Sequence, residues 1–195
     1  METNITSESK NGIFRAFVSA DVEKSEKILS LLKGLQKTNA DLKLVNPESI
    51  HITLKFLGDT PESIVPDITE IIRKSVLGIP PFALKFRGMG AFPNLNRINV
   101  VWVGIFNPEQ LTRIADLLDD KLAGLGFRKE GRRFSPHLTL ARVKSPRNIE
   151  ALQRLIAENR SIDCGDIAVE SIRLKKSALT PAGPVYSTIA EIKLE

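Results

Sequence analysis

The sequence is poor in cysteine and histidine, and it contains no long hydrophobic run. Cys164 is the only cysteine among 195 residues, so no disulfide can form within the chain. The longest nearly apolar stretch, Ile98 to Phe106, is far shorter than the roughly 20 residues that a membrane-spanning helix needs. Residues 1–11 are polar and lack the apolar segment of a secretory signal, so we expect a disordered tail there. These absences predict a cytoplasmic protein in which Cys164 is a small, partly buried side chain rather than a catalytic thiol.

Motifs for nucleotide and metal binding are also missing. No G-x-x-x-x-G-K-[ST] phosphate-binding loop occurs, which argues against ATP-driven chemistry. The only histidines are His51 and His137, and neither has an acidic residue beside it. Hydrolytic metal sites normally use several His, Asp or Glu ligands at characteristic spacings. We therefore expect no metal and no other cofactor. The net charge of +5 is a modest excess that suits an anionic partner.

One order of secondary-structure elements is predicted twice. The first half comprises a strand at Ile13–Ser19, a helix with Asp21 as its N-cap, a strand at Ile50–Leu57 ended by Gly58-Asp59, a helix at about Glu62–Val76 and a strand at Phe82–Phe86. Adding 86 to each number gives a strand at Ile98–Phe106, Asn107 as a second N-cap, the strand of His137, a helix from about Arg147 and a strand near Ile172. Repetition of this kind fixes the architecture of a chain.

The repeat predicts an α+β fold of two similar lobes related by an approximate two-fold axis. Mainly antiparallel sheets should line a central cleft, with the helices outside. We expect a single bilobal domain over residues 12–195, with repeat halves of about 12–92 and 97–180. The boundary between the lobes is expected in the loop Met89 to Arg97, which is rich in Gly, Pro and Asn.

Both histidines belong to one motif, His-x-Thr-Leu, at His51–Leu54 and His137–Leu140. A lone histidine on an apolar strand is usually a hydrogen-bonded core residue, but both histidines sharing one motif favours a functional role. Residues i and i+2 of a strand face the same way. Each strand should therefore present an imidazole and the hydroxyl of Thr53 or Thr139 to the cleft.

Two imidazoles and two hydroxyls suit an in-line displacement at phosphorus. Histidine changes charge near neutral pH, so one imidazole can remove a proton while the other delivers one. The threonine hydroxyls can donate to the non-bridging oxygens, where negative charge develops. Arg142 is the nearest candidate for an added cation. Strict alternation turns Arg142 away from the cleft, whereas a bend at the strand end would bring it back.

Basic residues gather around the second motif, at Arg128–Arg133 before it and at Arg142, Lys144 and Arg147 after it, while Lys55 follows the first motif. They are candidates for binding RNA phosphates, but the loop Arg128–Arg133 could equally be a basic turn exposed to solvent.

The chain resembles the 2H phosphoesterase superfamily, and within it the RNA 2′,3′-cyclic phosphodiesterases also described as 2′-5′ RNA ligases. The resemblance is carried by the two motifs, by Arg15–Val18 and by Pro184–Tyr186. It implies hydrolysis of a terminal RNA 2′,3′-cyclic phosphate to a 2′-phosphate, with His51 as proton donor and His137 as proton acceptor. Thr53, Thr139 and Arg142 would bind the phosphate.

Three alternatives stay open. The same site would support an ATP-independent 2′-5′ RNA ligase, in which an RNA hydroxyl replaces water, or a hydrolase of small cyclic nucleotides. An RNA-binding module without activity is a third possibility, although binding alone does not need residues that titrate. The expected partner is RNA with a cyclic phosphate end, and we expect a monomer.

Overall fold

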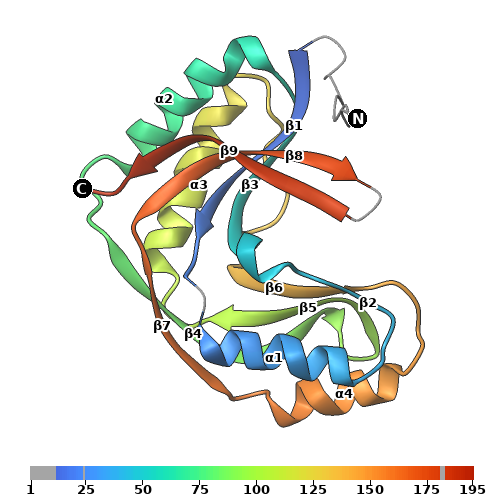
Figure 1. The fold of residues 1–195 in the computed structure, drawn as a ribbon. Coiled ribbons are helices and arrows are strands. Elements are labelled where there is room, and N and C mark those ends of the chain that lie inside the picture. Colours follow the sequence, from blue (N-terminus) through green and yellow to red (C-terminus); the bar gives the residue numbers. More distant parts are fainter. Residues whose placement is uncertain (1–11, 24, 181–182) are drawn as a thin grey trace, which may run out of the picture.

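The computed structural model describes residues 12–23, 25–180 and 183–195 (Figure 1). The predicted tail at residues 1–11 lies outside these ranges. In chain order the strands and helices are β1 (Ile13–Asp21), α1 (Glu26–Lys37), β2 (Leu42–Leu44), β3 (His51–Pro61), α2 (Val65–Val76), β4 (Phe82–Asn94), β5 (Arg97–Ile105), α3 (Glu109–Ala123), β6 (His137–Val143), α4 (Ile149–Glu158), β7 (Asp163–Val169), β8 (Ser171–Thr180) and β9 (Gly183–Lys193). Within the described residues, no helix is long and apolar enough to cross a membrane.

Two antiparallel sheets form the centre of the molecule, which confirms the predicted α+β class. The first sheet has the order β3-β1-β8-β9, and the second has the order β2-β6-β5-β4-β7. Helices α2 and α3 pack together on the first sheet, while α1 and α4 pack on the second (Figure 1). Buried apolar side chains of both sheets and all four of these helices form one contiguous cluster.

The repeat is visible in the strand order of the two sheets, β3-β1-β8-β9 and β6-β5-β4-β7. The first three strands of each series occupy equivalent positions, and they are related by the shift of 86 residues. However, the predicted lobe boundary is wrong. Residues Met89–Asn94 belong to β4, which forms a hairpin with β5. Strand β4 therefore pairs in the second sheet, and β8 from the second half pairs with β1 in the first sheet. Each sheet combines strands from both repeat halves, because the last strand of each half is exchanged and β2 of the first half pairs with β6.

The helices form where apolar residues recur at helical spacing, and they are exchanged between the sheets as well. In α1, Ile28, Leu31, Leu32 and Leu35 are buried and lie on one face. Although α1 follows β1 of the first sheet, it packs against β2 and β7 of the second. In the same way α3 follows β5 but contacts β3.

Three predicted boundaries need correction. Asp21 ends β1 and does not cap α1, whose N-cap is Ser25. Asn107 does not cap α3, since its side chain instead bonds to the backbone of Lys85 and Ala83. Gly58 does not end β3, because a φ of +70° that glycine tolerates lets the strand continue to Pro61.

Candidate active site

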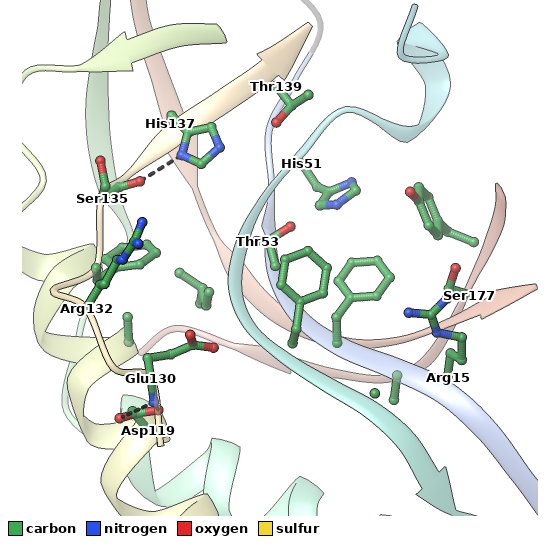
Figure 2. Close-up of a pocket in the computed structure, with 18 of the residues that line it drawn as sticks. Arg15, His51, Thr53, Asp119, Glu130, Arg132, Ser135, His137, Thr139 and Ser177 are labelled. Atoms are coloured by element: carbon green, nitrogen blue, oxygen red, sulfur yellow. Dashed lines mark hydrogen bonds between the residues drawn. The ribbon is translucent and has the colours of Figure 1, made fainter. Parts of the chain in front are cut away.

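A cavity of about 930 Å³ lies between the two sheets, and strands β3 and β6 contribute one histidine motif each to its wall. All five residues predicted for the site line this cavity, namely His51, Thr53, His137, Thr139 and Arg142. Figure 2 shows both imidazoles and both threonines turned toward the same space. The structure therefore brings together two motifs that are far apart in the sequence.

Strand alternation determines which side chains of each motif reach the cavity. Ile52 and Leu138, which lie between the histidine and the threonine, are completely buried in the core. His51 and His137 are partly exposed on the opposite face. This arrangement is the one that the i, i+2 spacing predicts.

The imidazoles are held by matching backbone contacts. The Nδ1 atom of His51 lies 2.7 Å from the carbonyl oxygen of Ser49, and Nδ1 of His137 lies 2.7 Å from that of Ser135. A carbonyl oxygen only accepts, so each Nδ1 carries a proton and donates it. In the neutral ring Nε2 is then the basic nitrogen, and it is the atom available to a reacting group.

Aromatic rings pack against both histidines. Phe17 and Tyr186 lie 4.9 Å and 5.2 Å from the ring centre of His51, and Phe92 lies 4.9 Å from that of His137. Burial lowers the pKa of both imidazoles, because removal from water disfavours the charged ring. The carbonyls of Ser49 and Ser135 act in the opposite direction. Both rings are therefore biased toward the neutral form in the free protein.

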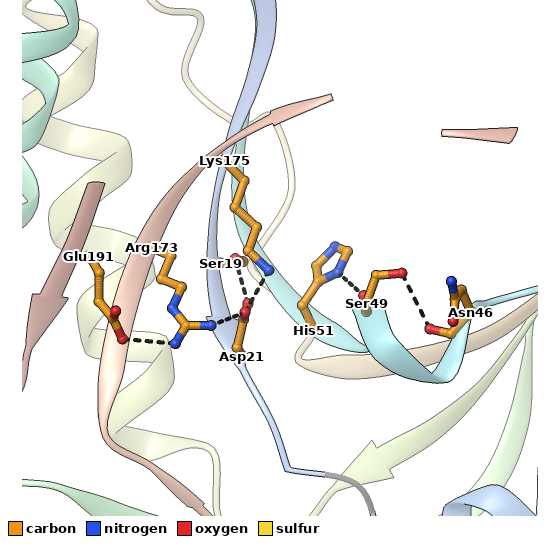
Figure 3. A network of polar contacts seen from close by, with 8 residues as sticks. All are labelled: Ser19, Asp21, Asn46, Ser49, His51, Arg173, Lys175 and Glu191. Carbon is orange, nitrogen blue, oxygen red and sulfur yellow. Dashed lines mark hydrogen bonds and ion pairs between the residues drawn. The ribbon is translucent and has the colours of Figure 1, made fainter. Parts of the chain in front are cut away.

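Charged neighbours differ between the two histidines. Asp21 lies opposite His51 on β1 and accepts hydrogen bonds from Lys175 and Arg173, as Figure 3 shows. Lys175 lowers the pKa of His51, and Asp21 raises it in partial compensation. Beside His137 the charged group that acts on the pKa is Arg142, which lowers it.

Arg142 reaches the cavity because β6 contains a β-bulge. Val101 of β5 pairs with Ala141 and the next residue of β5 pairs with Thr139, so Leu140 has no partner on β5. The extra residue reverses the alternation, and Arg142 faces the same side as Thr139. Of the two orientations that the sequence leaves open for Arg142, the structure has the one that faces the cavity, because strict alternation fails at Leu140.

A matching bulge occurs in β3. Val18 of β1 pairs with Lys55 and the next residue of β1 pairs with Thr53, which leaves Leu54 unpaired. Leu54 is equivalent to Leu140 under the shift of 86 residues. Phe56 is consequently the counterpart of Arg142, and it lines the cavity with 63% of its surface exposed. Sequence reasoning missed Phe56, although adding 86 to its number would have shown the correspondence.

Some of the basic residues around the motifs line the cavity and others do not. Arg132 and Arg133 line the cavity, whereas Lys129 forms an ion pair with Asp120 and lies outside it. Lys144 and Arg147 are not part of the wall. The interpretation of Lys55 as a phosphate contact is wrong, because its ammonium is buried.

Lys55 ties strand β3 to the loop that precedes β6. Its Nζ lies 2.5 Å from Oδ1 of Asp119 on α3 and 2.6 Å from the carbonyl oxygen of Arg128. Asp119 in turn accepts the backbone N–H of Glu130 (Figure 2). The loop from Gly124 to Pro136 has no helix or strand of its own and carries the carbonyl that orients His137. Lys55 therefore connects the two motifs structurally.

Two further expectations concern thiol and metal chemistry. The sequence predicts a partly buried Cys164, and in the structure it is buried, which raises the pKa of its thiol. In the ranges that the structure describes, no group of three His, Cys, Asp or Glu side chains is placed to hold a metal ion.

The two sheets and the paired motifs that face one cavity define a two-histidine (2H) phosphoesterase. The family model described as the 2′-5′ RNA ligase superfamily matches residues 25–175, and the chain belongs to this family.

Comparison with known proteins gives both sequence relatives and related folds. The RNA 2′,3′-cyclic phosphodiesterase of Methanothermobacter thermautotrophicus is 39% identical over 92% of this chain and 98% of its own length. The enzyme of the same name from Archaeoglobus fulgidus is 40% identical over 90% of this chain and 97% of its own. A crystal structure from Thermus thermophilus covers 92% of this chain and 97% of its own, with a TM-score of 0.74 and 28% identity. Escherichia coli LigT with 3′-AMP covers 93% and 98%, with a TM-score of 0.73 and 22% identity, and shows the fold alone.

Proposed function

We propose that this protein hydrolyses the 2′,3′-cyclic phosphate at an RNA end and leaves a 2′-phosphomonoester. The observation that carries the proposal is the pair of imidazoles, each fixed by a carbonyl at Nδ1 and each lining the same cavity. The relatives named RNA 2′,3′-cyclic phosphodiesterase, which align over about nine-tenths of the chain, support the same substrate.

In the proposed reaction, water attacks phosphorus and the bond from phosphorus to O3′ breaks, while the bond to O2′ remains. His137 removes a proton from the water, and His51 delivers a proton to O3′. Burial and the charge of Arg142 lower the pKa of His137 and favour the neutral form that a base needs. Burial and Lys175 act on the pKa of His51 in the same direction, so the pKa shifts do not by themselves assign the roles. The assignment of His51 as donor rests on the family resemblance.

The remaining residues of the site would bind the substrate. Arg142 and the hydroxyls of Thr53 and Thr139 can donate to the non-bridging oxygens, where charge develops in the transition state. Phe56, on the opposite side of the pseudo-two-fold axis from Arg142, offers an apolar face on which the terminal base can stack. A cyclic 2′,3′-phosphate requires a 2′-hydroxyl, so the substrate is RNA and not DNA.

The proposal is tested with an RNA that carries a 2′,3′-cyclic phosphate, by resolving the 2′- and 3′-phosphate products. We expect the 2′-phosphate alone. His51→Ala and His137→Ala should each lower kcat by about 10²-fold to 10⁴-fold, because general acid or base catalysis is worth that much. Phe106→Ala, which removes an exposed ring outside the cavity, is the matched control. Wild-type rates in both histidine variants would refute the catalytic assignment.

The same assay separates the competing activities. A second RNA with a 5′-hydroxyl is added, and joined product in excess of 2′-phosphate would show that the protein acts as a ligase. Hydrolysis of cyclic mononucleotides without hydrolysis of the RNA end would instead identify a small-molecule enzyme.

A further inference from the structure

The cavity contains more positive charge than one cyclic phosphate requires. Four arginines line it, namely Arg15, Arg132, Arg133 and Arg142, and within the described residues none of them forms an ion pair. A cyclic phosphodiester carries a single negative charge, which one guanidinium such as that of Arg142 can meet. Unpaired guanidinium groups that share a cleft repel one another unless an anion lies between them. The other three arginines therefore indicate a further anionic group.

Arg15 lines the cavity on β1, further along the strand than Phe17, which packs against the imidazole of His51. In the pairing of β1 with β3, Asp21 is opposite His51 and Arg15 is opposite Asp59. The imidazole of His51 nevertheless packs over Phe17, with ring centres 4.9 Å apart, and Phe17 is only two residues of β1, roughly 7 Å of strand, from Arg15. Stacked nucleotides advance about 3.4 Å each along one strand of a nucleic acid. Arg15 thus lies past the imidazole of His51 by about the rise of two stacked nucleotides, where the phosphodiester next to the reacting phosphate can reach it.

The surroundings of Arg15 match a phosphate group. Ser177 of β8 pairs directly with Arg15, and both side chains line the cavity. Figure 2 shows Arg15 and Ser177 together on the wall opposite Arg132. A guanidinium beside a hydroxyl is a common donor set for the phosphates of a nucleic acid backbone. Arg15 is exposed, so a ligand can reach it.

Acidic residues of the wall do not cancel this charge. Asp119 is bonded to Lys55, and Glu130 lies 3.6 Å from the same ammonium, so both carboxylates already have a cationic partner. Asp116 lines the wall on α3, together with Asp119, and Asp59 is the strand neighbour of Arg15. Among the described residues of the wall, four arginines face one carboxylate without an ion pair, that of Asp116.

We propose that Arg15 and Ser177 bind the phosphodiester that precedes the terminal nucleotide of a single-stranded RNA. The cleft then prefers oligonucleotide ends to cyclic mononucleotides. The proposal rests on the proposed function, since it places the reacting phosphate at the histidines and the terminal base at Phe56. Arg15 acts here as a specificity residue that touches the substrate outside the reacting centre.

The test compares kcat/KM for 2′,3′-cyclic AMP with that for a trinucleotide ending in a 2′,3′-cyclic phosphate. The wild-type protein should prefer the trinucleotide by about tenfold or more, the factor expected for one charge-assisted contact. Arg15→Gln should remove most of this preference by lowering the trinucleotide value, with the value for cyclic AMP changed less than about twofold. Arg15→Lys should retain part of it, because a point charge replaces a bidentate group.

Arg154→Gln is the matched control, since Arg154 is an exposed arginine of α4 outside the cavity. The dependence of kcat/KM on salt should become shallower for Arg15→Gln with the trinucleotide alone. Equal values for the two substrates in the wild-type protein, or an equal loss on both in Arg15→Gln, would overturn the upstream site while leaving the hydrolase intact. Failure of the wild-type protein to hydrolyse either substrate would overturn the proposed function itself.

Discussion

Replacement of Lys55 by methionine should destabilise the fold strongly, although the substitution keeps most of the apolar stem. The side chain of Lys55 is 1% exposed, and its ammonium holds Asp119 and the carbonyl oxygen of Arg128. Removing the ammonium leaves the carboxylate of Asp119 and the carbonyl of Arg128 without their bond to Lys55. At the equivalent position of the other bulged strand the residue is Ala141, which is fully buried, so the fold itself does not require a charge there.

The size of the effect follows from the burial of the two partners. Breaking a buried ion pair by removal of one member costs about 3–5 kcal/mol, because the other charge stays uncompensated. The side chain of Asp119 is 22% exposed and can recover some hydration. We therefore expect about 3 kcal/mol, the lower end of that range. For a domain of this size, this loss lowers Tm by roughly 6–12 °C.

Thermal and denaturant unfolding of four variants measures this prediction. Lys43→Met, which changes an exposed lysine on β2, should stay within about 0.5 kcal/mol of the wild type. The double variant Lys55→Met with Asp119→Asn should lose less stability than the sum of the single changes. A loss below about 1 kcal/mol for Lys55→Met, or additive effects in the double variant, would refute the ion-pair argument.

The pH dependence gives a second readout of the same pair. Burial raises the pKa of Asp119, but the hydrogen bonds from Lys55 and from the N–H of Glu130 together lower it by more. The pKa of Asp119 in the folded protein therefore lies below its usual range. The contribution of this carboxylate to stability is therefore present above the unfolded pKa of about 3.9 and disappears as the pH falls through the folded value. The Tm difference between wild type and Lys55→Met should narrow in acid, and a gap that widens there would contradict this origin.

Three further outcomes concern catalysis. Because burial lowers the pKa of His51 and His137, the bell-shaped profile of kcat/KM against pH should have its maximum below about 6.5, and a maximum above about 8 would contradict the assignment. Arg142→Lys should lower kcat about tenfold or more in steady-state assays, because lysine cannot make a bidentate contact to the phosphate. The control Arg113→Lys, which changes an exposed residue of α3, should not lower kcat. Equal kcat values for Arg142→Lys and the wild type would show that Arg142 does not stabilise the transition state. Incubation with EDTA should leave the rate within about twofold, and complete loss that one metal restores would replace the acid–base mechanism with a metal-assisted one.

The histidine faces could be predicted from the sequence because they depend on strand alternation alone. His51, Thr53 and the buried Ile52 obey the period of two, as do their counterparts on β6. The alternation fails one residue later, since Leu54 and Leu140 are bulged. Bulges leave little trace in hydrophobic patterning, which is why the orientation of Arg142 stayed open and Phe56 was missed.

The assignment of strands to lobes could not be predicted for a different reason. The periodicity of a segment shows that it is a strand, but it does not show which sheet accepts it. Strands β4 and β8 pair across the two repeat halves, through contacts that are remote in sequence. Lys55 shows a similar limit, because a charged residue after a motif is expected at the surface. Its burial is stabilised by Asp119, by Glu130 and by the carbonyl oxygen of Arg128, which are remote in sequence.

The exchange of β8 into the first sheet has a consequence for the synthesis of the chain. Ala20 of β1 pairs with Ile172 of β8, so the backbone groups on one edge of β1 have no strand partner until that distant segment has been synthesised. Lys175, which holds Asp21 opposite His51, arrives on the same strand. A nascent chain that already contains both histidines therefore cannot yet assemble the environment of the first one. The candidate active site therefore becomes complete only after β8 has left the ribosome.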